Sequence, residues 1–309
     1  MKNLARRFST GITFVLAACL AFALVSCSYQ EELNKDTEEQ MSADNSSSST
    51  AENLTVSAMT RMVYENGKGG GSTVELVYNS HGHVASLTQY DKADDGSESE
   101  YYNETYRFND ADELKSFTYS YGETQIATGS ALSNIEQDPN DPGGTIEKQI
   151  FDPEITNPYK IDDQIKELIS VNMDIVLNAD GVATSIDYTA DWSAENATES
   201  DNCVWKFEDD GRLNAFTKAA TNAVGVELTT VNYQFTFSDQ ALTVTDQSGA
   251  TVFSFDITFD KDGNLTSLES TDEANPIKFT FDYETVTSSE EITMAYLKTI
   301  PYVQMTYMM

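Results

Sequence analysis

Histidine and cysteine are scarce in this sequence of 309 residues, which has two of the first and three of the second. Both histidines, His81 and His83, flank Gly82 in a predicted turn. A His-x-His pair can bind a metal, but no third ligand is identifiable, so exposed turn residues are the simpler interpretation. Without another histidine, and without a Gly-x-Ser-x-Gly elbow, nucleophilic catalysis is not expected. The sequence predicts no catalytic, cofactor-binding or metal-binding residue.

Basic residues are also in short supply. Lysine and arginine number 18 against 51 aspartates and glutamates, and the formal net charge is −33. Such a charge repels nucleic acid and anionic lipid headgroups, so nucleic acid is excluded as a partner, and neutral, cationic or metal-bridged partners are expected. With so many acids, a hydrolase that uses two carboxylates stays open as an alternative, although nothing in the sequence singles out a pair.

The chain begins with a secretion signal. Lys2, Arg6 and Arg7 precede an almost unbroken apolar run from Gly11 to Val25. This run is shorter than the roughly 20 apolar residues that a bilayer span requires, so a transmembrane anchor is the weaker interpretation. The sequence therefore predicts an exported protein.

A cysteine stands at the end of this run, in Leu24-Val25-Ser26-Cys27. These four residues resemble the lipobox of bacterial lipoproteins. The resemblance implies that residues 1–26 are removed, that Cys27 carries the lipid, and that the mature protein is held in the cell envelope by this lipid, at the outer membrane or the cell surface. The alternative is an ordinary signal peptide with a chance cysteine near the cleavage site.

Cys203 is then the only thiol left, because Cys19 is lost with the leader and Cys27 is acylated. An internal disulfide is therefore excluded. Cys203 precedes Val204 and Trp205 on a probable strand, which predicts a buried and unreactive side chain.

Residues 27–53 are polar, acidic and rich in serine, and they end in the run Asn45-Ser-Ser-Ser-Ser-Thr50. Such a segment cannot bury enough apolar surface to offset its ordering entropy. We expect a flexible tether between the lipid and a folded part formed by residues 54–309.

The folded part alternates apolar and polar residues with a period of two, which is typical of half-buried antiparallel strands. The alternation is clearest at Val56–Tyr64, Val231–Phe237, Phe253–Phe259 and Ile277–Tyr283.

One turn pattern recurs between these strands. An Asn or acidic residue opens it, a glycine follows three places later, and apolar, small and apolar residues stand two, four and five places after the glycine. This spacing interrupts strict alternation, so a β-bulge is expected after each turn. The segments are Tyr78–Leu87, Leu177–Ile186, Phe207–Phe216 and Phe259–Leu268, with a degenerate copy at Phe108–Phe117 that has Asp112 in the glycine place.

These segments resemble the tyrosine-aspartate hairpin repeats of bacterial secreted proteins and the similar repeats of lipoproteins of unknown function. Gly82 precedes Asp112 by the same 30 residues that separate Gly181 from Gly211. Equal spacing predicts an internal duplication of residues 54–171 in 172–309, with chance as the alternative.

Two helices and one long loop are predicted to interrupt the strands. Ile161, Ile165, Leu168 and Ile169 have helical spacing, and a second helix is expected to open at Ser288-Ser289-Glu290-Glu291 and to stop at Pro301. Residues 129–158 are expected to form an irregular insert. The apolar terminal segment, residues 302–309, is expected to dock as a last strand.

The sequence thus predicts a mainly β fold, an antiparallel meander of hairpins in one elongated or curved sheet with one or two short helices packed on it. The predicted function is that of a non-enzymatic envelope lipoprotein that binds a glycan or protein on its sheet face. The alternatives are a lipid carrier or assembly factor with helices lidding a curved sheet, and a carboxylate-dependent hydrolase. Core packing is the first interpretation of the many tyrosines at strand spacing, and a flat recognition face formed by Tyr101, Tyr102, Tyr119 and Tyr121 is the alternative.

Overall fold

A computed structural model describes residues 54–109, 114–161, 164–194, 197–221, 227–288 and 291–309. The leader, Cys27 and the tether, together with Asp112 and the Ser289-Glu290 pair, lie outside the described residues. The lipid-attachment prediction at Cys27 therefore stays a prediction.

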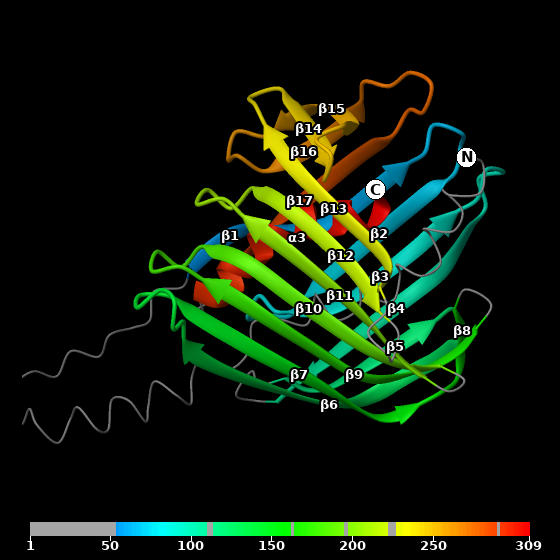
Figure 1. Ribbon diagram of the computed structural model, residues 1–309, viewed down its shortest axis with the longest axis vertical. Helices are drawn as coiled ribbons and strands as arrows, with labels where there is room; N and C mark the ends of the chain where they lie inside the picture. The colour runs from blue at the N-terminus through cyan, green and yellow to red at the C-terminus, as the bar shows by residue number, and fades with distance from the viewer. Residues whose placement is uncertain (1–53, 110–113, 162–163, 195–196, 222–226, 289–290) are drawn as a thin grey trace, which may run out of the picture.

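The described chain contains 17 strands and a C-terminal helix (Figure 1). The strands of the first half are β1 (Leu54–Glu65), β2 (Gly71–Tyr78), β3 (Val84–Lys92), β4 (Glu98–Phe108), β5 (Leu114–Tyr121), β6 (Thr124–Gln137), β7 (Thr145–Thr156), β8 (Tyr159–Ile161) and β9 (Gln164–Leu177). The second half holds β10 (Ala183–Ala194), β11 (Ala197–Phe207), β12 (Leu213–Thr221), β13 (Glu227–Phe237), β14 (Ala241–Asp246), β15 (Thr251–Phe259), β16 (Leu265–Ser270), β17 (Lys278–Ser288) and α3 (Glu291–Met308).

The sheet closes into a barrel. Successive strands pair antiparallel from β1 to β7, β7 pairs with β9, and the series continues to β17. β17 then pairs with β1 from Leu54↔Ser288 to Glu65↔Lys278, which completes a ring of 16 strands with the short β8 attached beside β9. The prediction of one open, elongated or curved sheet is therefore wrong. The closing pair joins the first strand to the last, and such a long-range contact leaves no local mark in the sequence.

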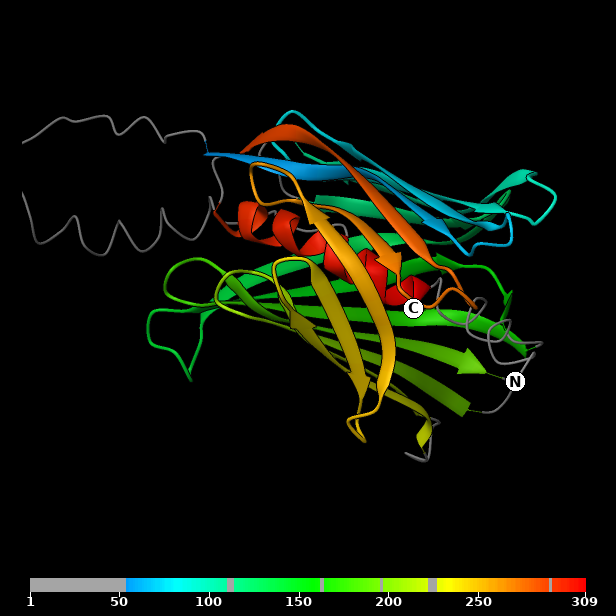
Figure 2. The ribbon, with the colours of Figure 1, turned by 90° about the horizontal axis from the view of Figure 1, so that it is seen from above.

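The helix runs inside the barrel, between opposite walls (Figure 2). It packs against β1 and β17 on one side and against β9, β10 and β12 on the other. From Met294 to Tyr307 its side chains are buried, with the exception of the exposed Lys298. The helix thus forms part of the core of a closed barrel, whereas the sequence predicted one or two short helices packed on the face of an open or curved sheet.

The recurring turn has the structure expected from its residues. Gly82, Gly181, Gly211 and Gly263 all have positive φ angles, between 71° and 88°. At the first of these turns the Asn79 Oδ1 accepts hydrogen bonds from the backbone N–H groups of His81 and His83, at 2.9 and 3.0 Å. A side chain that bonds to the backbone two residues ahead is an Asx-turn, so the predicted turn chemistry is confirmed.

The expected bulges are also present. After each of the five turn segments the strand register shifts by one residue, and the extra residue stands three places after the glycine position. The two apolar residues on either side of the bulge can then both face the interior, as Val84 and Leu87 do. The extra residues are Ala85, Lys115, Thr184, Asn214 and Thr266.

The helix predicted around residues 161–169 does not form. This segment belongs to β8 and β9, and β9 has a register shift opposite Asp191 and Trp192 that makes Ile169 the extra residue. The bulge places Leu168 inside and leaves Ile169 44% exposed. The adjacent apolar residues Leu168 and Ile169 therefore gave helical spacing in a segment that forms a strand.

The predicted irregular insert at residues 129–158 is also wrong, because β6 and β7 form a regular hairpin there. Asp138 to Gly144 make the turn, which Asp141 holds through hydrogen bonds from the backbone N–H groups of Gly143 and Gly144.

The second predicted helix does form, but Pro301 does not stop it. Residues 302–308 continue the helix and do not add a strand. An interior proline removes one backbone hydrogen bond and crowds the preceding turn. Here the helix is enclosed by the barrel walls, and this packing outweighs the loss.

Candidate functional site

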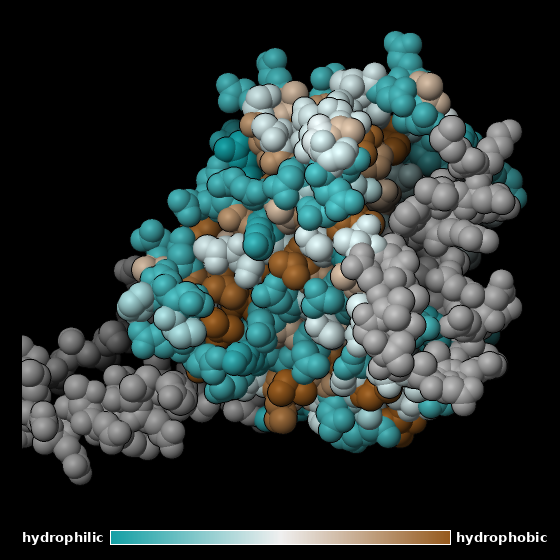
Figure 3. Space-filling view, viewed as in Figure 1, coloured by the Kyte–Doolittle hydropathy of each residue, from teal (hydrophilic) through white to brown (hydrophobic). Residues whose placement is uncertain are grey.

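The two faces of the barrel wall differ in chemistry. Large apolar side chains point inward, where Phe117, Phe255 and Phe279 are at most 1% exposed. Outward positions carry polar ladders, such as Asn103 donating to Thr88 at 2.8 Å and Asn202 donating to Thr189 at 3.0 Å. The outer surface in view is accordingly hydrophilic over most of its area, with smaller apolar patches (Figure 3).

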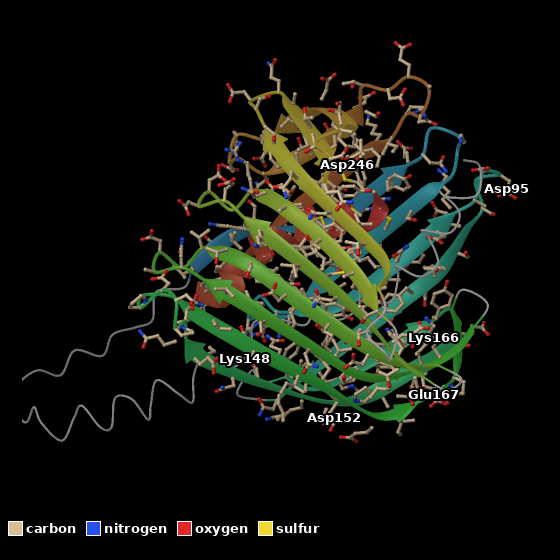
Figure 4. The ribbon with its side chains drawn as sticks, in the orientation of Figure 1. Asp95, Lys148, Asp152, Lys166, Glu167 and Asp246 are labelled. Atoms are coloured by element: carbon tan, nitrogen blue, oxygen red, sulfur yellow. The ribbon has the colours of Figure 1, made fainter. Side chains whose placement is uncertain are left out.

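Charged side chains reinforce this outer face. Arg61 on β1 lies 3.6 Å from Glu75 on β2 and 3.9 Å from Asp282 on β17, so charged groups bridge the strands next to the closing pair. On β7, Lys148 and Asp152 extend from the lower wall, and Lys148 forms an ion pair with Glu136 (Figure 4). Several apolar side chains interrupt this face. Leu132 and Ile150 face each other across β6 and β7 at 70% and 49% exposure, and Val77 and Ile155 are each 57% exposed.

The interior consists of two halves. In one half α3 lies among aromatic side chains of the wall. Trp205 on β11 is fully buried, stacks on Phe216 with ring centroids 5.3 Å apart, and contacts Tyr307 of the helix at 5.6 Å. The Trp205 Nε1–H donates to the Thr306 hydroxyl at 2.9 Å. This half is an apolar core with the helix at its centre.

The other half, which we call the polar lumen, is formed by strands β2 to β7. The buried amides and carboxylates of the described wall strands all come from this half. Buried polar groups destabilise a fold unless each finds a partner, so their concentration in one half requires an explanation. These residues are Gln89, Glu104, Glu147 and Gln149, and the buried Ser72 hydroxyl on β2 belongs to the same half.

Glu104 lies at the centre of the polar lumen. It is 0% exposed and accepts a hydrogen bond from the Tyr106 hydroxyl. Burial raises the pKa of the Glu104 carboxyl well above its usual range, and hydrogen bonding from Tyr106 and Tyr102 opposes this shift only in part. The folded chain therefore favours the neutral form of Glu104.

Tyrosines surround this carboxyl from two walls. Tyr102 and Tyr106 flank it on β4, and Tyr119 faces it directly across the β4–β5 pair. Tyr188 approaches from β10 on the opposite wall. Burial raises the pKa of Tyr102, and the neighbouring Glu104, Tyr119 and Tyr188 raise it further. Tyr102, Tyr119 and Tyr188 are at most 1% exposed.

A second carboxyl is held on β7. Glu147 is 0% exposed, and its Oε1 accepts hydrogen bonds from the Ser133 hydroxyl at 2.7 Å and from the Gln149 amide at 2.6 Å. These bonds fix the side chain from two neighbouring strands.

A row of polar side chains leads from Glu104 toward one end of the barrel. Gln89 lies opposite Tyr102 across the β3–β4 pair, and its Nε2 donates to the Asp91 Oδ1 at 3.1 Å. The Ser72 hydroxyl donates to the same oxygen at 2.8 Å. Asp91 is partly exposed and stands one residue before the end of β3. The row therefore connects the centre of the polar lumen to the end that carries the β3–β4 turn, marked by Asp95 in Figure 4.

Two further tyrosines stand near the same end. The Tyr101 and Tyr121 rings meet edge to face with centroids 4.2 Å apart, and both side chains are half-buried. The sequence predicted core packing for most tyrosines, with a flat recognition face formed by Tyr101, Tyr102, Tyr119 and Tyr121 as the alternative. The structure places Tyr102 and Tyr119 in the polar lumen and leaves Tyr101 and Tyr121 partly accessible.

The remaining candidates have structural roles. His81 is exposed, as predicted, but His83 is only 1% exposed and stacks on Phe108 with centroids 5.4 Å apart, so the prediction of two exposed histidines is wrong for His83. Burial lowers the pKa of His83 to about 3, which keeps it neutral. Cys203 is buried, as predicted, and burial raises the pKa of its thiol to about 12.

Sequence reasoning missed Gln89, Glu104 and Glu147. The signal was present in Tyr102-Asn-Glu-Thr-Tyr106, where Glu104 occupies the same face of the strand as two aromatic residues. An acid at an inward position of an alternating strand is the pattern to look for.

Within the described ranges, no group of three or more His, Cys, Asp or Glu side chains is arranged to hold a metal ion. The same part of the chain contains no helical segment with the length and hydropathy of a membrane-crossing helix.

No protein-family profile matches the sequence, and no curated protein matches it. Among solved structures, the chain is similar to a porin-like protein from Bacteroides vulgatus ATCC 8482, with 8% identity, a TM-score of 0.32, and coverage of 74% of this chain and 99% of that one. It is also similar to TcdB2-TccC3, with 9% identity and a TM-score of 0.22, and to TcdB2-TccC3 with Cdc42, with 8% identity and a TM-score of 0.19.

These last two similarities cover 72% and 73% of this chain but only 13% and 18% of the other chains. At such identities and TM-scores the barrel assignment rests on the strand pairing of the chain itself.

Proposed function

We propose that this protein is a lipid-anchored cell-envelope protein whose barrel stands in water beside the membrane and binds a ligand without catalysing a reaction. The observation that carries this proposal is the orientation of the wall, with apolar side chains inside and charged or polar side chains outside. A barrel that spans a bilayer has the opposite arrangement, an apolar outer band and a polar interior.

The anchor supplies the contact with the membrane that such a wall cannot make. A net charge of −33 disfavours contact between the barrel and anionic headgroups, and two or more acyl chains hold a protein stably to a bilayer. The lipobox-like Leu24–Cys27 is the segment that we assign to this role. Outer membrane and cell surface both fit this proposal.

The polar lumen is the reason to propose ligand binding. Apolar residues in place of Gln89, Glu104 and Glu147 would give a core of at least similar stability, since buried polar groups rarely improve stability over well-packed hydrophobic ones. Stability therefore does not account for these polar groups, whereas a bound ligand would. The carrier alternative has less support, because α3 already occupies the apolar half of the interior and a lipid would have to displace it.

Replacing residues 1–27 with a cleavable, non-lipidated signal peptide tests the anchored, water-exposed barrel. The natural protein should pellet with membranes and enter the detergent phase in Triton X-114 partitioning. The replaced form should be soluble and monodisperse without detergent, with an unchanged β-type circular dichroism spectrum. A replaced form that still needs detergent for solubility would show that the wall itself contacts lipid, and the proposal would fail.

A further inference from the structure

The buried ionisable groups of the chain include several acids. Glu104, Glu147 and Asp138 are buried, whereas no lysine or arginine whose exposure the structure describes is buried. A buried carboxylate needs a cation or a proton, because its charge is costly in a low-dielectric interior. In the absence of a buried base, a cation that pairs with Glu104 would have to come from a ligand.

The polar lumen also offers acceptors in excess. The Gln89 Oε1 is buried and has no hydrogen-bond partner, while the Nε2 of the same amide is engaged by Asp91. Gln89 is 4% exposed, so bulk water does not satisfy this oxygen. A buried acceptor left unmatched destabilises the fold, and a ligand that donates a hydrogen bond to it would recover this loss. The site is therefore complementary to N–H groups.

Aromatic rings complete the environment. Tyr102 lies beside Gln89, and the Tyr101–Tyr121 pair stands near the accessible end of the row. Tyrosine rings attract cations through their negative faces. Carboxylates, an amide oxygen and aromatic rings together match an organic ammonium group better than a phosphate or a carboxylate.

We propose that the row from Asp91 through Gln89 and Tyr102 to Glu104 binds a short linear polyamine that enters from the β3–β4 end of the barrel. This inference rests on the proposed ligand-binding function and names its ligand class. Asp91 lies two residues after Gln89 on β3, and Glu104 lies two residues after Tyr102 on the antiparallel β4, so the two acids stand on opposite sides of the Gln89–Tyr102 pair. Their separation along the strands is about 13 Å, four residues at roughly 3.3 Å each. One terminal ammonium pairs with Asp91, the amide oxygen of Gln89 accepts from the chain between, and the other terminus meets Glu104.

Binding at Glu104 involves a proton. The neutral carboxyl loses its proton to the buffer, and the carboxylate that forms pairs with the ammonium group. The groups that face Glu104 are Tyr102 and Tyr106 on β4, Tyr119 on β5 and Tyr188 on β10, with the apolar Leu87 opposite on β3. All of these tyrosines are neutral, so the released proton comes from the acid. Affinity therefore rises with pH.

The test is isothermal titration calorimetry on the full natural chain in the polyether detergent C12E8, with spermidine as the probe and maltohexaose as a neutral comparison. Spermidine titrations in phosphate and in HEPES, whose ionisation enthalpies differ, give the number of protons released. We expect spermidine binding with release of about one proton and no heat from maltohexaose.

The variants separate the lumen from the acidic outer surface. Glu104→Gln keeps the shape of the neutral acid and should abolish proton release, and Gln89→Leu should weaken binding at least about tenfold, the effect of losing a hydrogen bond to a charged group. Glu269→Gln and Gln234→Leu make the same changes at exposed positions and should leave both quantities unchanged. Circular dichroism confirms folding, and Glu104→Gln suffices if Gln89→Leu fails to fold.

Several outcomes overturn the inference. Equal spermidine binding in Glu104→Gln and in the natural chain, without proton release in either, assigns the polyamine to the outer surface. Binding of maltohexaose in place of spermidine assigns the lumen to sugars. No binding of either removes the polyamine assignment but leaves the anchored barrel intact, since that proposal depends on solubility and partitioning.

Discussion

The hydrogen bond between Trp205 and Thr306 provides a direct test of whether α3 lies inside the barrel. Trp205 on β11 donates from Nε1 to the Thr306 hydroxyl at 2.9 Å, and both side chains are buried, at 0% and 5% exposure. Thr306 in turn donates to the Val303 carbonyl at 2.8 Å. We would break this contact from each side with Trp205→Phe and Thr306→Val, and then from both sides at once.

The expected magnitudes follow from what each change leaves behind. Thr306→Val leaves the buried indole N–H without an acceptor, at a cost of about 1–3 kcal/mol. Trp205→Phe removes the donor and leaves a small void beside Phe216 and Tyr307, at a cost of about 2 kcal/mol or more. The double variant leaves no unpaired N–H, so it should be more stable than the sum of the single changes predicts, by about 1–2 kcal/mol.

Urea unfolding followed by far-ultraviolet circular dichroism gives the four free energies of unfolding. Thr299→Val is a matched control, because the Thr299 hydroxyl is also buried and donates to a backbone carbonyl, that of Tyr296, at 2.7 Å. Its combination with Trp205→Phe should be additive within about 0.5 kcal/mol. Additivity in the Thr306 pair as well would refute the placement of the helix against β11.

Three further predictions address other parts of the barrel. Because burial raises the pKa of Glu104, the folded chain keeps a proton that the unfolded chain loses above about pH 4.3, so this residue lowers the free energy of unfolding as pH rises. Glu104→Gln should therefore gain stability relative to the natural chain between pH 5 and 8 in urea titrations; parallel curves of unfolding free energy against pH would contradict this. Gly82→Ala should lower the melting temperature more than Gly263→Ala, since both glycines have positive φ but only at Gly82 would a Cβ lie 2.9 Å from the Val286 side chain. Equal decreases would show that backbone strain alone sets the loss of stability. Cys203 should resist iodoacetamide in the folded protein and react once urea is added, because burial raises its pKa to about 12; modification at the rate of a free thiol in native buffer would contradict the burial.

The parts of the fold that the sequence predicted are those set by local chemistry. Alternation at Val231–Phe237 and Phe253–Phe259 predicted β13 and β15 because each strand has one buried face. The Asn or Asp before each turn glycine predicted both the positive φ and the bulge, since these depend on residues within ten positions of one another.

The parts that the sequence did not predict depend on contacts between distant residues. Leu168 and Ile169 looked helical because a bulge in β9 interrupts the alternation there. Closure depends on β1 meeting β17, and the alternation of each strand is the same in an open and a closed sheet. Residues 302–308 form a helix despite Pro301 because the barrel encloses them on every side, a condition set by the closed ring.

The candidate site could be predicted only in part. Sequence analysis selected the tyrosines on β4 and β5 but left core packing and a flat recognition face as alternatives, since the direction of a strand's faces is not fixed until the sheet closes. Glu104 was passed over because one acid among 51 has no distinguishing mark until its burial is known.

Joining the first strand to the last has a consequence for how the molecule is made. Leu54 cannot meet Ser288 until nearly the whole chain has been synthesised, so β1 and β17 each keep a free edge until then. Contacts this far apart in sequence slow folding, and free edges pair readily with other chains. Newly made chains must therefore be kept apart until this seam forms, and we expect exchange of terminal strands between two molecules to be the typical misassembly of such a ring.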